Sequence, residues 1–248
     1  YESKGKRSGA YSSGCYDSNP FILMNYREDD INSMYTLAHE AGHSMHSFLA
    51  RETQPYLYAD YAIFVAEVAS TFNEALLTKH LLSQDIDQNM KIFLICREID
   101  NLRGTLYRQT MFAEFEHQIY AAAENDQPMT LDAFTSVYRK LLEKYFGKEV
   151  VLDDCLLLEC FRIPHFYFSF YVYKYATGIS AAYALADRVL EGAVGELNDY
   201  LNFLKGGGSQ YPIDLLKGAG VDMTSAEPIS TALKKFSALV DQLESLTV

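Results

Sequence analysis

The sequence lacks the features that would direct its protein to a membrane or to nucleic acid. No apolar run approaches the roughly 20 residues of a membrane-spanning helix, and the opening residues show no secretory pattern of basic residues followed by an apolar stretch. Positive charge is scarce: 21 lysines and arginines face 33 aspartates and glutamates, so the net charge is −12. A nucleic-acid partner requires a basic face. We therefore expect neither a membrane nor a nucleic acid as partner.

Cysteine is scarce as well. The chain has four cysteines without C-x-x-C spacing, too few in 248 residues for a disulfide scaffold: Cys15, Cys96, Cys155 and Cys160. They predict reduced thiols in a cytoplasmic protein. The chain begins at Tyr1 rather than at a methionine and opens on a loop-like stretch, from which we expect a piece of a longer protein.

The composition and the apolar pattern predict a helical fold. Because 49% of the residues are hydrophobic and 22% are charged, the chain can bury a sizeable core. We predict one all-α domain with one short strand or hairpin near the N-terminus. Residues 1–20 are predicted as loop, Phe21–Tyr26 as strand, and residues 206–208, all glycine, as a turn. Helices are predicted at residues 29–49, 60–82, 87–123, 130–146, 165–191, 195–205, 213–218 and 226–246.

The strongest chemical signal is an H-E-x-x-H motif at residues 39–43. On a helix, His39 and His43 project from one face, which lets two imidazoles bind one Zn²⁺. Glu40 lies one step round the helix, where it can act as a general base without binding the metal. Gly42 weakens a helix, so its place inside the motif suggests a close approach of another backbone. The motif predicts a metal site.

A catalytic zinc takes a third protein ligand. The extended motif H-E-x-x-H-x-x-G-x-x-H is excluded, because His46 and Leu49 stand where it needs Gly and His. We interpret His46 as a packed histidine or as a partner of a ligand. The next predicted helix offers Glu67 and Glu74, seven residues apart and therefore on one face. Small apolar neighbours make an unpaired Glu67 costly to bury, which favours it as ligand, and Glu74 could hold the second ring nitrogen of a ligand histidine.

An aromatic segment at residues 162–178 is the next candidate. Most such stripes are core helices, but Tyr171 and Tyr175 are four residues apart, and buried tyrosine hydroxyls need partners. Together with His165, these hydroxyls could stabilise the oxyanion of a tetrahedral intermediate. Nearer the start, three glycines at positions 5, 9 and 14 form an ordinary flexible loop or one that approaches a ligand.

Together these pieces resemble the thimet oligopeptidase/oligoendopeptidase F family of zinc metallopeptidases. The matching pieces occur in the order of the family: KGKRSGAYS, PFILMNY, TLAHEAGHSMHS, FVAEVASTFNEALL, IPHFYFSFYVYKYATG and PIDLLKGAGVDMTSAEPI. The resemblance implies a zincin-type pair of active-site helices that holds one Zn²⁺ per chain. It also implies that residues 1–248 are the C-terminal catalytic part of a longer enzyme, whose N-terminal half supplies the other wall of a deep substrate channel.

The resemblance also implies roles for single residues. His39, His43 and Glu67 are the implied zinc ligands, and Glu40 is the implied general base. Among the residues implied to touch the substrate at the scissile bond are His165, Tyr175 and Tyr171. The spacing of these tyrosines differs from that of the thimet branch. The glycine loop and the strand at 21–26 are implied to line the substrate channel.

The implied function is the hydrolysis of internal peptide bonds in oligopeptides. One alternative is a zinc carboxypeptidase or dipeptidase, in which a basic residue captures the terminal carboxylate. A second alternative is a fragment that binds peptides without catalysis, and the intact Glu40 argues against it.

Overall fold

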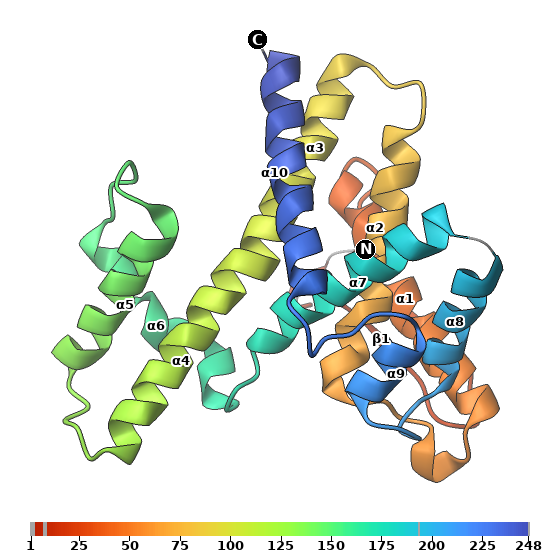
Figure 1. Cartoon of the computed structure of the whole chain (residues 1–248), viewed down its shortest axis with the longest axis horizontal. Helices are drawn as coiled ribbons and strands as arrows, with labels where there is room; N and C mark the ends of the chain where they lie inside the picture. Colours follow the sequence, from red (N-terminus) through yellow and green to blue (C-terminus); the bar gives the residue numbers. More distant parts are fainter. Residues whose placement is uncertain (1–2, 7–8, 193, 248) are drawn as a thin grey trace. The chain divides into compact units, whose positions relative to one another are not determined.

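The computed structural model describes residues 3–6, 9–192 and 194–247, and the chain divides into two compact units (Figure 1). The first unit comprises Tyr1–Ile99 and Thr177–Val248, and the second comprises Asp100–Ala176. The predicted fold class is confirmed, because helices dominate and the one sheet among the described residues is a two-stranded hairpin. Among those residues, no helix is long and apolar enough to cross a membrane.

The hairpin of the first unit pairs β1 (Ala10–Ser13) with β2 (Phe21–Met24) in antiparallel register, so that Ala10 faces Met24. The strand predicted at Phe21 is confirmed, although it ends at Met24. The prediction of loop for residues 1–20 is wrong at β1, and residues 1–2 and 7–8 lie outside the described part. The sequence AYSS has no strong strand pattern, and its backbone finds its hydrogen bonds through pairing with β2.

Helices α1 (Ile31–Thr53) and α2 (Ile63–Leu82) form the centre of the first unit. The Asp30 carboxylate caps α1 by accepting a hydrogen bond from the Asn32 backbone N–H. A short 3-10 turn, η1 (Tyr56–Tyr58), follows Pro55 and leads to α2. The two helices touch at Gly42, where an added Cβ would lie 2.4 Å from the Ala69 carbonyl oxygen. The close approach expected from this glycine is confirmed.

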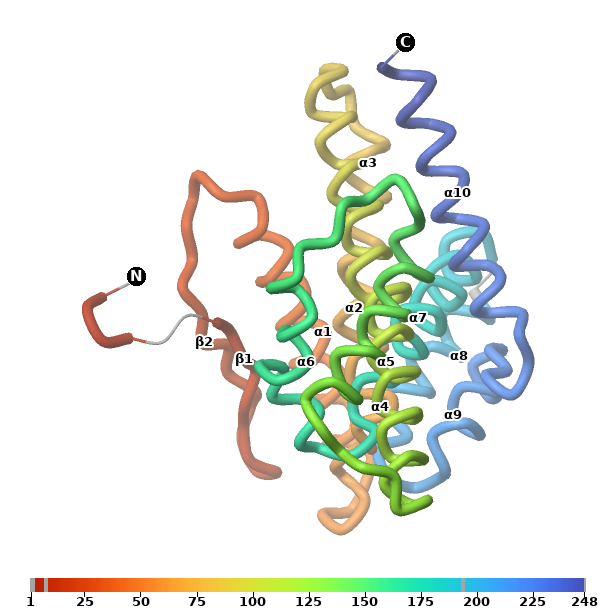
Figure 2. The backbone as a smooth tube through the Cα atoms, turned by 90° about the vertical axis from the view of Figure 1, so that its left-hand side faces the viewer, coloured from red at the N-terminus to blue at the C-terminus, as the bar shows by residue number. Residues whose placement is uncertain are grey.

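The first unit contains further helices. They are the first part of α3 (Gln88–Leu102), most of α7 (Tyr173–Glu191), α8 (Val194–Lys205), α9 (Pro212–Gly218) and α10 (Glu227–Thr247). Helices α3 and α10 run antiparallel, because the Gln88 side-chain amide at the start of α3 donates to the Leu246 carbonyl near the end of α10, 2.8 Å away (Figure 2). The predicted glycine turn is confirmed: the Gly208 N–H donates to the Tyr58 carbonyl at 2.8 Å.

The second unit is built on an antiparallel pair, α4 (Arg108–Glu124) and α5 (Leu131–Phe146), with four short elements around it: η2 (Arg103–Tyr107), η3 (Asp154–Leu158), α6 (Glu159–Arg162) and η4 (Pro164–Tyr167). Thr130 caps the start of α5, and Gly147, with φ of +75°, ends it. Buried Glu159 accepts hydrogen bonds from Arg108, Arg162 and Tyr138, and so ties the short elements to both helices.

The predicted helix at 165–191 is wrong in its first part. The chain makes the 3-10 turn η4 and an irregular stretch before α7 begins at Tyr173. Phe170 has φ of +52°, and its N–H donates to the Glu116 carboxylate on α4 at 2.5 Å instead of to a helical carbonyl. The helix predicted at 87–123 is likewise interrupted, by a π-helical turn at η2. Before α7, the tertiary contact between Phe170 and Glu116 overrides the local helical pattern of the sequence.

The contact at Gly42 predicts the effect of one added methyl group. Gly42→Ala should lower the free energy of unfolding by about 1–3 kcal/mol, because the Cβ would overlap the α2 backbone and outweigh the better helix propensity of alanine. Gly104→Ala is the matched control, since nothing lies within 4 Å of a Cβ there. Urea denaturation followed by circular dichroism measures both. A Gly42→Ala protein as stable as the control would contradict the proposed close packing.

Candidate metal and catalytic site

The H-E-x-x-H motif lies on α1, and both of its histidines face Glu67 on α2. Glu67 Oε2 is 3.4 Å from His39 Nε2 and 3.6 Å from His43 Nε2. The two imidazole rings meet edge to face, with their centroids 4.9 Å apart. One ligand atom from each of the three residues lies within 4.8 Å of the others. The structure therefore brings together the three residues that the family resemblance implied as ligands.

The packing of helices explains why Glu67 faces the motif. Gly42 sits between the two histidines on α1 and touches the α2 backbone at Ala69 and Ser70, about one turn beyond Glu67. Ser70 donates its hydroxyl to Glu67 Oε2 at 3.1 Å. On the other side, a Cβ on Gly178 of α7 would lie 3.4 Å from the Glu67 Cβ, so α7 also approaches Glu67 closely. Glu67 is thus held by three helices.

Glu67 and Glu74 face different nitrogens of His39. Glu74 Oε1 lies 2.7 Å from His39 Nδ1, whereas Glu67 faces Nε2. With Nδ1 bonded to a carboxylate, Nε2 is the nitrogen left to bind a metal, which would displace the proton that Nε2 shares with Glu67. Two imidazole nitrogens and one carboxylate oxygen are a donor set that catalytic zinc takes in proteins. The residues present therefore fit a zinc ion.

The pKa values of the three residues reflect how tightly they are coupled. Burial acts to lower the pKa of His39, but its hydrogen bonds with Glu67 and Glu74 outweigh burial and raise the pKa to about 10. Burial lowers the pKa of His43. Burial would raise the pKa of Glu67, yet the two histidines and Ser70 bring it below the usual range of a glutamate. Glu67 is therefore ionised at neutral pH, as a metal ligand must be.

Glu40 has surroundings unlike those of Glu67. It is 6% exposed, and its Oε2 is buried without a hydrogen-bond partner among the described residues. Burial raises the pKa of Glu40, and a hydrogen bond from the Ser12 backbone of β1 partly offsets this. A cavity of about 400 Å³ reaches both Glu40 and His39, and Gly9, just before β1, lines it too. A carboxylate of raised pKa beside an open cavity can exchange protons with a bound molecule.

The interpretation of His46 as a packed residue is confirmed. The side chain is 1% exposed, and its ring stacks on Tyr61 with the centroids 3.6 Å apart and the planes nearly parallel. Burial lowers the pKa of His46 to about 3, so the imidazole is neutral at physiological pH. His46 is not part of the group that could hold a metal.

The three aromatic candidates lie in the second unit and meet one another there. The Tyr175 hydroxyl is 3.4 Å from His165 Nε2, and the Tyr171 ring stacks on the His165 ring with the centroids 5.4 Å apart. Residue 165 stands in η4, Tyr171 in the irregular stretch and Tyr175 in the first turn of α7. The structure groups these residues with one another, and their roles toward a substrate stay predictions.

Sequence reasoning missed the residues behind His39. Arg97 of α3 and Tyr35 and Asn32 of α1 line the same cavity as Glu40. Arg97 follows Glu74 by 23 residues and belongs to no motif, so nothing in the sequence pointed to it. Strand β1 was missed too, although its Ser12 hydroxyl lies 2.8 Å from that of Ser44 on α1.

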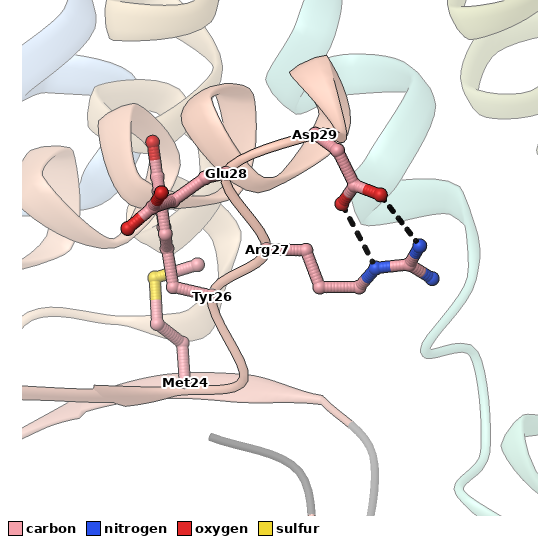
Figure 3. Close-up of a pocket in the computed structure, with 5 residues that line it drawn as sticks. All are labelled: Met24, Tyr26, Arg27, Glu28 and Asp29. Atoms are coloured by element: carbon pink, nitrogen blue, oxygen red, sulfur yellow. Dashed lines mark hydrogen bonds and ion pairs between the residues drawn. The ribbon is translucent and has the colours of Figure 1, made fainter.

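A second cavity, of about 540 Å³, lies at the loop after β2 and is lined by Met24, Tyr26, Arg27, Glu28 and Asp29. Figure 3 shows the Arg27 and Asp29 side chains pointing toward each other, as the exposed ion pair at 3.3 Å requires. Exposed ion pairs of this kind contribute little to stability. The residues that line this cavity include none of the buried carboxylates or imidazoles found beside His39.

The chain is similar in sequence to known proteins. The sequence model described as Peptidase family M3 matches residues 1–235. The chain is 52% identical to "Oligopeptidase PepF" of Bacillus subtilis, over 99% of this chain and 37% of that protein. It is 46% identical to "Group B oligopeptidase PepB" of Streptococcus agalactiae, over 98% of this chain and 40% of that protein. The chain thus spans about two fifths of the length of these relatives.

A solved structure is similar as well. The crystal structure of oligoendopeptidase-F from Enterococcus faecium superposes with a TM-score of 0.78 at 40% sequence identity, and covers 88% of this chain and 39% of that one. The two chains are therefore similar in sequence as well as in fold.

Burial of His46 predicts a pH dependence of stability. The folded pKa of about 3 is below the ordinary value of 6.5, so between these values only the unfolded chain takes up a proton here. The stabilisation is complete above pH 6.5 and is lost as the pH falls. His46→Phe keeps an aromatic ring and removes this proton. Between pH 6.5 and 5.5, the wild type should lose about 1 kcal/mol more than His46→Phe in urea denaturation. Equal losses would show that His46 is not buried in the neutral form.

Proposed function

We propose, because this chain belongs to peptidase family M3, that it carries the zinc-dependent active site of an enzyme that hydrolyses internal peptide bonds of oligopeptides. The observation that supports this most is the convergence of His39, His43 and Glu67, with the buried carboxyl of Glu40 beside them. The names of the relatives, oligopeptidase and oligoendopeptidase, support the substrate class.

His39, His43 and Glu67 are the proposed ligands of one zinc ion per chain. Zinc bound there would supply Lewis acidity and would activate water near neutral pH. The residues of the chain prepare for this: Glu74 holds His39 by Nδ1, and Ser70 fixes the Glu67 carboxylate. Ligands held in this way need little rearrangement when the metal binds.

Glu40 is the proposed general base and acid. Its carboxylate accepts a proton from the attacking water and then donates that proton to the leaving amine. The raised pKa suits this exchange, because a base and acid works best when its pKa lies near the working pH. Ser12 of β1 orients the carboxylate through its backbone, and the cavity at Gly9 leaves room for a peptide.

His165 and Tyr175, with Tyr171 as a further candidate, are proposed to stabilise the oxyanion that develops on the scissile carbonyl. Their proximity supports a shared role, since the Tyr175 hydroxyl and the His165 imidazole lie within 3.4 Å and can share a proton. A donor held in place before charge develops lowers the barrier because it requires no reorganisation.

The four cysteines are free, which supports the proposed cytoplasmic location, where thiols are kept reduced.

The proposed ligand set predicts the zinc content of two variants. The purified chain should hold one zinc ion, and Glu67→Ala should lose it, because two histidines alone make an incomplete site. Glu52→Ala, at an exposed position of α1, is the matched control and should keep the metal. Inductively coupled plasma mass spectrometry after dialysis against trace zinc measures the content. Undiminished zinc in Glu67→Ala would remove Glu67 from the ligands.

The proposed base predicts that Glu40→Gln keeps zinc and loses turnover. Glutamine has the shape of glutamate but cannot accept the proton, so peptide cleavage should slow by at least ~10²-fold. Mass spectrometry of a digested oligopeptide mixture measures the rate and also maps the cleavage positions. Cuts at internal bonds are expected, whereas cuts confined to the last residues would favour a carboxypeptidase or dipeptidase. Near-normal turnover by zinc-loaded Glu40→Gln would exclude Glu40 as the base, and no cleavage by the wild type would favour a binding fragment.

A further inference from the structure

His39, Glu74 and Arg97 form a chain of hydrogen bonds that leads away from the proposed metal site. His39 uses Nδ1 to bind Glu74 Oε1 at 2.7 Å, and Glu74 uses its other oxygen, Oε2, to accept a hydrogen bond from Arg97 Nη2 at 3.4 Å. The three side chains come from α1, α2 and α3 of the first unit. Each oxygen of Glu74 therefore has its own partner, and the orientation of its carboxylate depends on both of them.

Arg97 is itself held on two sides. Its Nε donates to the Asn32 side chain at 3.3 Å, and its guanidinium carbon lies 3.2 Å from the centroid of the Tyr35 ring. Its Nη1 is buried without a hydrogen-bond partner among the described residues. The side chain is 18% exposed and that of Glu74 is 16% exposed. A guanidinium enclosed in this way has few alternative positions, and solvent screens its charge only weakly.

The Tyr35 ring, on which the Arg97 guanidinium lies, is held in place by contacts in the core. Tyr35 is 1% exposed, and its hydroxyl lies 3.0 Å from that of Thr78 on α2. Thr78 in turn donates to Glu98 at 3.3 Å, and the Tyr183 hydroxyl on α7 donates to Glu98 at 2.7 Å. Glu98 is the neighbour of Arg97 on α3, so two adjacent residues fasten α3 to the helices that carry the metal site. This network predicts that Arg97 stays in place when Glu74 is changed.

We propose that Arg97 is a positioning residue of the metal centre, which acts through Glu74 to set the orientation of His39. The inference rests on the zinc site of the proposed function. Glu74 is a second carboxylate within hydrogen-bond distance of His39, on the Nδ1 side of its ring. The ion pair with Arg97 occupies Oε2 and keeps Glu74 as the partner of Nδ1, and Glu67 then remains the carboxylate available to the metal. Without Arg97, Glu74 would retain a partly buried charge with one partner fewer.

The loss of zinc affinity in single and double variants tests this role. Zinc dissociation constants are measured by competition with a chromophoric chelator for the wild-type chain, Arg97→Gln, Glu74→Gln and the double variant. Each single variant should bind zinc about 10-fold more weakly, the lower end of what loss of an outer partner of a ligand histidine costs. The double variant should be no weaker than Glu74→Gln alone, because Arg97 acts only through Glu74. Arg97→Lys, which keeps the charge but loses the planar fork, should show a smaller loss than Arg97→Gln.

Two controls separate positioning from folding. Lys79 lies on the same helix as Glu74 and forms an ion pair with Asp187. Lys79→Gln removes this ion pair and should leave zinc affinity unchanged. Thermal unfolding of the metal-free proteins shows whether Arg97→Gln is folded, and if it is not, Arg97→Lys carries the test.

Three results would overturn the proposal: wild-type affinity in both Arg97 variants, or losses that add in the double variant, or a wild-type chain that binds no zinc. The third would also refute the proposed function, whereas the first two would leave it intact.

Discussion

The site depends on one contact, the approach of α1 to α2 at Gly42. Because a Cβ at this position would lie 2.4 Å from the Ala69 carbonyl oxygen, only glycine permits the two helices to pack at this distance. The contact falls between His39 and His43, so the residue that weakens the helix is also the one that lets Glu67 reach them. A helix that carried the same two histidines with alanine between them would stand farther from its third proposed ligand. Gly42 thus lowers the stability of α1 itself but allows the close packing of α1 against α2.

Three glutamates lie around His39, and their surroundings differ. Glu67 is ionised because the histidines and Ser70 outweigh the effect of burial on its pKa. Burial raises the pKa of Glu40, which suits proton transfer. Glu74 is paired with His39 on one oxygen and with Arg97 on the other. Environments that separate the behaviour of neighbouring carboxyl groups are typical of catalytic sites.

The sequence predicted the parts of the fold and of the site that are set by residues close together along the chain. The H-E-x-x-H spacing placed His39 and His43 on one helix face, and the apolar pattern predicted the helix that carries them. The residues alone left Glu67 and Glu74 open, because both lie on one face of α2 and only the packing of α1 decides which nitrogen each one meets. Arg97 could not be predicted, since its contact with Glu74 joins two helices and no spacing rule connects them. The break before α7 was missed for a similar reason: the Glu116 carboxylate binds the Phe170 N–H across the second unit.

The central claim is that α1 and α2 together supply one zinc site from His39, His43 and Glu67. Its most direct test is anomalous diffraction on both sides of the zinc absorption edge, from crystals of the chain equilibrated with zinc. The account predicts one anomalous peak at about 2.0–2.2 Å from Nε2 of each histidine and from the Glu67 carboxylate, with Glu74 still on Nδ1 of His39. A peak bound by Glu74 in place of Glu67, or no peak between the two helices, would contradict it.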